Sequence, residues 1–262
     1  MKNNISRTFC IGDIHGGYKA FIQVLEKVSF DYDNDKLIAL GDATDGWPET
    51  AEVIEELIKI KKLVYLKGNH DEWTERFLRD ALKTGPTSEN HLWYSQGGKE
   101  TYDSYFNKSE EMLNVHLEFL TNALEYYIDE DNRVFVHAGF NPRVAMDKQY
   151  HMDVGQTKKG ENATFYWDRS FWGYMIEQRN FEKVGVIWGQ YKEIYIGHTP
   201  TINYNDDKPI NIGNVWNMDT GATYSGKLSI MNIDTKEITQ SEPLYLLYPE
   251  HMGRNREYLA KK

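Results

Sequence analysis

Five short stretches of the sequence place residues with metal-binding side chains directly after an apolar run and next to a glycine. They are FCIGDIHGGY with Asp13 and His15, LIALGDATDGW with Asp42 and Asp45, LVYLKGNHDEW with Asn69 and His70, RVFVHAGF with His137, and EIYIGHTPT with His198. The first stretch taken alone could equally be a polar turn that leads into the next helix. Together the five predict one cleft, because open α/β sheets bind ligands at the carboxyl ends of their strands.

The ligand types in these stretches indicate a particular class of metal site. Carboxylate, imidazole and amide groups suit first-row metals such as Mn, Fe, Co, Ni or Zn. A closed structural zinc site is not expected, because the single cysteine, Cys10, lies within an apolar run and is interpreted as a small buried residue. Even two of these aspartates, three of the histidines and the asparagine together exceed what one catalytic metal needs. We therefore expect two divalent or trivalent ions, manganese first, that share a carboxylate at roughly 3.5–4 Å separation.

The segments that must position these residues alternate between strand and helix in the first half of the chain. Strand-like runs end near residues 12, 41 and 68, and helix-like runs cover about 18–28, 48–60 and 71–85. This order predicts parallel strands with right-handed crossovers. The second half predicts a helix over about 110–124, a hairpin over 126–139, strands near 193–198 and 214–221, and a hairpin over 226–240.

The organisation of the chain predicts one α/β domain over residues 1–250 and a solvated C-terminal tail over 251–262. Two polar, aromatic excursions near 86–110 and 141–190 are expected to form part of a substrate cleft. By length alone, a chain of 262 residues suits one large domain or two small ones.

Composition and charge exclude several classes of function. The net charge of −10 and the pI near 5.3 argue against broad binding to nucleic acid, which needs a positive face. The stretch MKNNISRTF lacks the apolar core of a signal peptide, and no apolar run reaches the roughly 18 residues of a membrane span. We expect a cytoplasmic protein with no membrane contact and no obligate partner.

In order and spacing, the motifs GDIHG, GDATD, GNHD, HAG and GHTP resemble those of the calcineurin-like metallophosphoesterases. Within that superfamily the chain is similar to the phosphoprotein phosphatase branch, especially its bacterial and phage members, and to symmetrical dinucleoside-tetraphosphatases. The resemblance spans residues 12 to about 230. It implies a four-layer α-β-β-α sandwich with a two-metal site at the carboxyl ends of the strands.

The resemblance also implies a role for each motif residue. The implied metal ligands are Asp13 and His15 for the first ion, Asp42 for both ions, and Asn69, His137 and His198 for the second. His70 would lie near the leaving group with Asp45 hydrogen-bonded to it. Two cations make hydroxide available near neutral pH. That hydroxide would attack phosphorus directly, while His70 protonates the leaving alkoxide as general acid.

One position departs from the family pattern. The second motif of the family reads Gly-Asp-x-x-Asp-Arg-Gly, whereas GDATDGW places Gly46 where a phosphate-binding arginine is expected. Arg169 in FYWDRSFW resembles a Trp-x-Arg element that contacts phosphate in bacterial members; the alternative is a surface ion pair with Asp168. Lys67 is a weaker candidate, which could equally be a solvated charge at a strand end. Asn69 is also a candidate substrate contact.

Three functions follow as hypotheses. The first is a phosphatase for phosphomonoesters, in particular phosphoserine or phosphothreonine in proteins. The second is a hydrolase of nucleotides, dinucleoside polyphosphates or phosphodiesters, in which aromatic residues of the two excursions would stack on a base. The third is a noncatalytic partner-binding module on the same fold, which the retention of every ligand-type residue disfavours.

Overall fold

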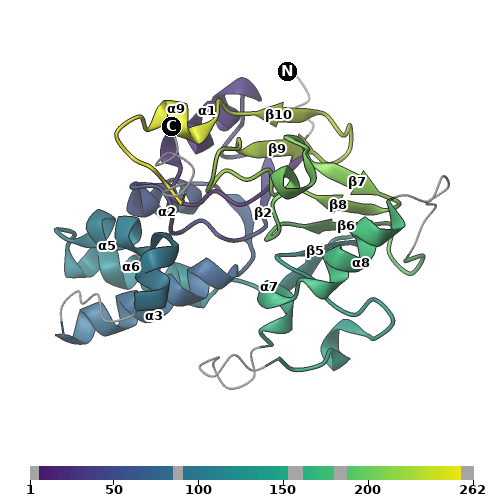
Figure 1. Cartoon of the computed structure of the whole chain (residues 1–262), viewed down its shortest axis with the longest axis horizontal. Helices are drawn as coiled ribbons and strands as arrows, with labels where there is room; N and C mark the ends of the chain where they lie inside the picture. Colours follow the sequence, from purple (N-terminus) through teal and green to yellow (C-terminus); the bar gives the residue numbers. More distant parts are fainter. Residues whose placement is uncertain (1–5, 85–90, 153–161, 180–187, 255–262) are drawn as a thin grey trace.

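Two mixed sheets of five strands form the centre of the computed structural model, which describes residues 6–84, 91–152, 162–179 and 188–254 (Figure 1). The first sheet has the order β10-β9-β1-β2-β3, formed by Ile238–Gln240, Ser229–Asn232, Thr8–Ile11, Lys36–Ala39 and Lys62–Tyr65. The second has the order β4-β5-β6-β8-β7, formed by Tyr126–Ile128, Arg133–Val136, Glu193–Ile196, Val215–Asn217 and Ile210–Ile212. Each sheet contains three neighbouring parallel strands, β1-β2-β3 and β5-β6-β8, with antiparallel strands beside them.

The predicted alternation of strand and helix in the first half is confirmed. Helix α1 (Tyr18–Lys27) connects β1 to β2, α2 (Thr50–Ile58) connects β2 to β3, and α3 (Asn69–Thr84) follows β3. These helices form because their apolar residues recur at helical spacing, and in α1 that spacing buries one face against the first sheet. The two predicted hairpins are present as β4-β5 and β9-β10.

Side chains alternate along the strands and so build a core on each face of each sheet. Phe9 and Ile11 of β1 pack among the helices, whereas Cys10 between them packs toward the second sheet. The core between the sheets contains Cys10, Ile38, Leu40, Leu66, Phe135, Tyr195, Met218, Met231 and Ile233. Helices α7 (Thr164–Trp167) and α8 (Ser170–Gln178) cover the outer face of the second sheet. The four layers implied by the resemblance are therefore observed (Figure 1).

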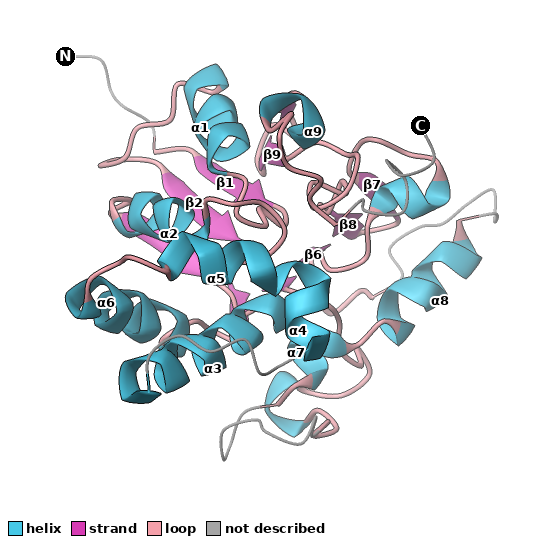
Figure 2. Cartoon of the chain, turned by 60° about the vertical axis from the view of Figure 1, so that its left-hand side comes forward, coloured by secondary structure: helices cyan, strands magenta, loops and turns pink. Residues whose placement is uncertain are grey.

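The first aromatic excursion is more regular than the sequence indicates. Over its described part it forms α4 (His91–Trp93), the kinked segment η1 (Tyr94–Gly98) and α5 (Lys99–Tyr105), and α6 (Glu110–Thr121) follows. Figure 2 shows α5 with α1 and α2 in front of the first sheet. Gly97 adopts φ 101°, and its carbonyl accepts the Gly46 N–H at 3.0 Å. This contact fixes the excursion against the loop that follows β2. Short helices of this kind carry no long apolar stripe, so periodicity does not reveal them.

The remaining described elements are the 3₁₀ turns η2 (Met146–Lys148) and η3 (Thr201–Tyr204) and the short helix α9 (Leu244–Leu247). Among the helices of the described ranges, none is both long and apolar enough to cross a membrane.

Candidate active site

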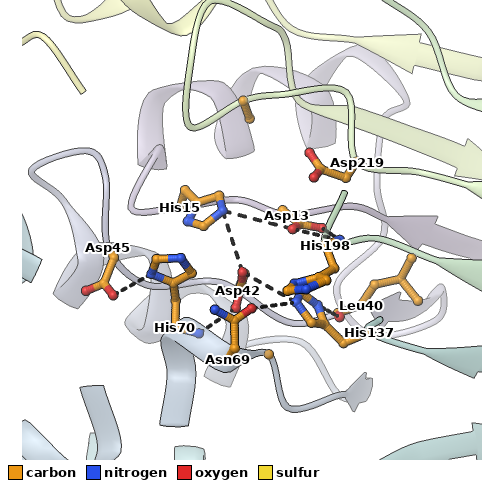
Figure 3. A network of polar contacts seen from close by, with 12 residues as sticks. Asp13, His15, Leu40, Asp42, Asp45, Asn69, His70, His137, His198 and Asp219 are labelled. Atoms are coloured by element: carbon orange, nitrogen blue, oxygen red, sulfur yellow. Dashed lines mark hydrogen bonds and ion pairs between the residues drawn. The ribbon is translucent and has the colours of Figure 1, made fainter. Parts of the chain in front are cut away.

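The loops that follow the parallel strands bring the predicted ligands into one cluster (Figure 3). The Nε2 atoms of His15 and His137 lie 3.7 Å and 3.4 Å from Oδ2 of Asp42. Oδ1 of Asn69 lies 3.3 Å from Nε2 of His137. The remaining two predicted ligands are also adjacent, because the backbone N–H of His198 donates to Oδ2 of Asp13 at 3.1 Å. All six predicted ligands are buried and converge from four loops and the first residue of α3.

Four site residues have backbone conformations that residues other than glycine rarely adopt. The φ angles are 52° at His15, 50° at Asp42, 66° at Asp45 and 67° at His198. Each such residue costs on the order of 1–3 kcal/mol and persists only where its surroundings hold it in place. Here the Asp42 carbonyl accepts the His15 N–H at 2.8 Å, so the loops after β1 and β2 hold each other. This clustering of strain is typical of functional sites.

The donor set fits a pair of metal ions. Ligand atoms lie within 4.8 Å of one another in two groups, His15-Asp42-His70 and Asp42-His137-His198, and Asp42 belongs to both. Nδ1 of His137 donates to the Leu40 carbonyl at 2.7 Å, so Nε2 carries the lone pair when the ring is neutral. Nε2 of His198 is buried and has no hydrogen-bond partner within the described part of the chain. An orphaned buried nitrogen beside a shared carboxylate is what a bound cation would satisfy.

Burial and charge shift the pKa values of these groups in opposing directions. Burial lowers the pKa of His15 to about 3 and holds that of His198 well below its usual range. Burial also disfavours protonated His137, but the Asp42 carboxylate outweighs it and raises the pKa of His137 to about 9. Burial and the neighbouring Asp219 hold the pKa of Asp13 well above its usual range. Cations bound in the cluster would offset these shifts, because they stabilise the ionised form of a carboxylate and the neutral form of an imidazole.

His70 and Asp45 form a hydrogen-bonded pair beside the ligand cluster (Figure 3). Nδ1 of His70 donates to Oδ2 of Asp45 at 2.7 Å. The Asp45 carboxylate also accepts from Trp93 Nε1 at 2.9 Å and from Thr101 Oγ1 at 2.8 Å. Because these donors fix the carboxylate, the imidazole is held with Nδ1 inward, and His70 lines the cavity. A histidine oriented in this way can hold or move a proton at Nε2.

A cavity with a volume of about 330 Å³ opens onto the cluster and contains Arg169 in its wall. Nη1 of Arg169 donates to the His198 carbonyl at 3.2 Å and to Thr199 Oγ1 at 3.0 Å. Within the described residues Arg169 forms no ion pair with Asp168. The alternative prediction, that Arg169 only forms a surface ion pair with Asp168, therefore gains no support. Lys67 is only 1% exposed and pairs with Glu75 Oε2 at 2.9 Å, outside the residues that line this cavity.

Asp219, which is not among the predicted site residues, also lines the cavity. It follows β8 and is buried; burial and the charge of Asp42 raise its pKa to about 6. A signal for it exists, because NVWNMDTG repeats the order of apolar run, aspartate and glycine seen in the other motifs.

Asp71 is a second residue for which the sequence predicts little consequence. Its buried carboxylate accepts the backbone N–H groups of Asp42 at 2.8 Å, Ala43 at 3.1 Å and Gly68 at 2.8 Å. It therefore holds together the loops after β2 and β3. Sequence offers no signal, because acidic residues are common in the first turn of any helix.

The expectation of a solvated tail is wrong for Gly253 and Arg254. Gly253 is buried, and Arg254 is half-buried and lines the cavity beside His70. The rest of the predicted tail, 255–262, lies outside the described residues. The contact between Arg254 and His70 joins residues 184 positions apart, so no local pattern could reveal it.

Two packed sheets with buried Asp, Asn and His side chains at their strand ends, and an oriented histidine beside them, form the arrangement expected of a metal-dependent hydrolase. Residues 6–208 match the family model of the calcineurin-like phosphoesterases. The chain belongs to this family, and it is a metal-dependent phosphoester hydrolase.

Individual relatives represent two kinds of phosphatase. The chain is 25% identical over 232 residues to serine/threonine-protein phosphatase 1 of Salmonella typhimurium, across 88% of this chain and 93% of that protein. It is 25% identical over 281 residues to a symmetrical bis(5'-nucleosyl)-tetraphosphatase of Neisseria gonorrhoeae, across 88% and 94%. A solved structure described as a putative diadenosine tetraphosphatase shares the fold with a TM-score of 0.58 at 19% identity, across 92% and 95%. These relatives favour neither substrate class.

Proposed function

We propose that this phosphoesterase acts on phosphomonoesters of aliphatic alcohols, in particular phosphoserine or phosphothreonine in proteins. The observation that carries this proposal is the buried His70-Asp45 pair, with its 2.7 Å hydrogen bond, at the cavity wall. A serine or threonine alkoxide needs a proton as its bond to phosphorus breaks, whereas a nucleotide released from a polyphosphate is already a stable anion. A carboxylate-oriented histidine is therefore of most use for the alkyl ester.

The metals would be held by the six predicted ligands, Asp13, His15, Asp42, Asn69, His137 and His198, with Asp42 shared between the two ions. When bound, they supply Lewis-acid stabilisation of phosphate charge and an activated water. Manganese and a cytoplasmic location belong to this proposal as predictions from the sequence.

The chain's own residues supply the remaining chemistry. Arg169 donates N–H groups to phosphate oxygens from the cavity wall, and the amide of Asn69 is a further candidate contact. His70 delivers a proton from Nε2 to the leaving oxygen, and Asp45 stabilises the charged imidazole through Nδ1–H. Lys67 is not included, because its ammonium group is buried against Glu75.

A specific observation favours the second candidate, a dinucleoside-polyphosphate hydrolase. Trp73 and Trp167 both line the cavity, with ring centroids 5.2 Å apart. Exposed faces of such rings can stack on a nucleobase. The relatives named as tetraphosphatases point the same way.

A metal-reconstitution assay tests the proposal. The protein is stripped with chelator and given Mn, Fe, Co, Ni or Zn singly, and hydrolysis of a phosphothreonine peptide, nitrophenyl phosphate and a dinucleoside tetraphosphate is followed in parallel. We expect metal-dependent turnover with the highest kcat/KM on the peptide, lost in Asp42→Asn and strongly reduced in His70→Asn. Higher efficiency on the tetraphosphate would transfer the assignment to the second candidate. No turnover by a protein with two bound metals would favour the noncatalytic module.

A further inference from the structure

The C-terminal segment places Arg254 in the cavity, and packing on the Trp47 ring holds this segment in position. Tyr248 stacks on the buried Trp47 ring, with centroids 5.2 Å apart and planes at 22°. Gly253 packs on the same ring so closely that a Cβ would lie 2.7 Å from Cζ2 of Trp47, and its φ of 53° also favours glycine. The backbone N–H of Arg254 then donates to the Thr223 carbonyl at 3.2 Å. The position of Arg254 is therefore determined by packing, not by the guanidinium itself.

The guanidinium of Arg254 faces the reacting end of the site. Its Nη1 donates to Nε2 of His70 at 3.1 Å, its Nη2 contacts Oε1 of Gln96, and the group stands 5.1 Å from the centre of the Tyr224 ring. Among the described residues, no carboxylate forms an ion pair with Arg254. A permanently charged group held against neutral partners in a polar cavity is suited to an anionic ligand.

We propose that Arg254 binds the phosphoryl group of the substrate; this inference rests on the proposed function and deepens it. An arginine only donates hydrogen bonds, so Nε2 of His70 accepts in the observed contact. Phosphate oxygens accept two parallel, charge-assisted bonds from a guanidinium, which are stronger than one bond to a neutral imidazole. A bound phosphate therefore draws Arg254 off His70, and the same shift frees Nε2 to face the leaving oxygen. Arg254 and Arg169 line the same cavity and would hold the phosphoryl group together.

This assignment also gives a physical account of Gly46. A Cβ on Gly46 would lie 2.7 Å from Oγ1 of Thr223, the residue whose carbonyl holds Arg254. The loop that supports the C-terminal segment thus occupies the space that a side chain at 46 would need. The cation reaches the cavity from the C-terminal segment instead of from the loop after β2.

The test compares Arg254→Gln and Arg254→Lys with Arg179→Gln in the full-length, metal-loaded protein. Arg179 is a matched control, because it is an arginine at 41% side-chain exposure whose partner is Asp206 and which does not line the cavity. Binding of inorganic phosphate is measured by calorimetry, and KM and kcat are measured on the phosphothreonine peptide. Melting temperature and bound metal are determined for each variant.

We expect Arg254→Gln to weaken phosphate binding by about 10- to 100-fold and to raise KM by a similar factor, as for loss of hydrogen bonds to a charged group. Arg254→Lys should retain part of the affinity, and Arg179→Gln should match the parent. Gly253→Ala, which keeps the arginine but displaces its anchor, should weaken phosphate binding in the same direction. Unchanged phosphate affinity in Arg254→Gln with normal metal content would overturn the proposal, as would tighter binding, which would mean that Arg254 only obstructs the site. Binding of inorganic phosphate needs no turnover. The calorimetric result therefore still tests the role of Arg254 if the proposed reaction is not observed.

Discussion

Replacing Asp45 with asparagine tests the proton-delivering pair without changing the shape of the site. Oδ1 of Asp45 accepts a hydrogen bond from Thr101 Oγ1 at 2.8 Å, and Oδ2 accepts one from His70 Nδ1. The indole N–H of Trp93 is shared between the two oxygens, at 3.0 Å from Oδ1 and 2.9 Å from Oδ2. An asparagine oxygen can retain Thr101 and Trp93, so its NH₂ group must face Nδ1 of His70. That nitrogen then has to accept a hydrogen bond, and the charged imidazole loses its stabilising partner.

The expected loss follows from the bond that is removed. A hydrogen bond to a charged group contributes about 1.5–3 kcal/mol. In the transition state this corresponds to a reduction in kcat of roughly 10- to 150-fold. The loss applies only where the leaving oxygen needs the proton. We therefore expect this loss on a phosphothreonine peptide, and a change within about threefold on nitrophenyl phosphate, because nitrophenolate leaves without a proton.

The assay is steady-state kinetics on both substrates at saturating metal, with bound metal and melting temperature measured for each variant. Asp103→Asn is the matched control, because Asp103 is exposed and pairs only with Lys99 among the described residues. Equal losses on both substrates with normal metal content would refute the assignment of His70 and Asp45 to proton delivery. Such a result would indicate that the pair only maintains the structure of the loop.

Three further predictions follow from the geometry. Gly68→Ala should abolish binding of at least one metal, because its Cβ would lie 2.0 Å from Oδ1 of Asp42; elemental analysis of the purified variant measures this, and full metal content would contradict it. Gly173→Ala is the opposite case, since nothing lies within 4 Å of its Cβ in helix α8, and it should raise the free energy of unfolding by roughly 0.5–1 kcal/mol in denaturant titrations. Metal uptake should release at least one proton at pH 7, because the pKa of His137 is raised to about 9 and an imidazole must be neutral at the nitrogen that binds a metal. Apparent metal affinity should then rise by about tenfold per pH unit up to that pKa. Calorimetry in two buffers of different ionisation enthalpy measures the proton release, and a binding enthalpy that is the same in both buffers would contradict this prediction.

The parallel-strand part of the site could be predicted because it depends on a short-range rule. Asp13, Asp42 and His137 each follow an apolar strand, and the carboxyl ends of parallel strands meet at one edge. The same rule covers Asp219, whose stretch has the same form, although Asp219 is not among the predicted site residues. The physical basis is that the alternation of side chains along a strand and the order of strand, turn and helix can be seen in short segments of the sequence.

The helical structure of the first excursion could not be predicted in the same way. Residues 91–105 form short helices that Gly97 and the loop after β2 hold in place, and their apolar side chains pack only in the assembled core. Trp93 shows the consequence, because its indole N–H reaches the carboxylate of Asp45, 48 positions earlier. Such contacts depend on how the layers pack, which local propensity does not encode.

The sequence by itself determined the family, the order of strands and helices in the first half, and the six residues that converge as candidate metal ligands. These depend on residue type and on spacing within short segments. Only the tertiary structure decided that Lys67 is buried against Glu75, that Asp71 holds the two loops together, and that Arg254 lies at His70. The physical reason is that a charged side chain acquires its function from the partners it meets after folding, and those partners lie on distant parts of the chain.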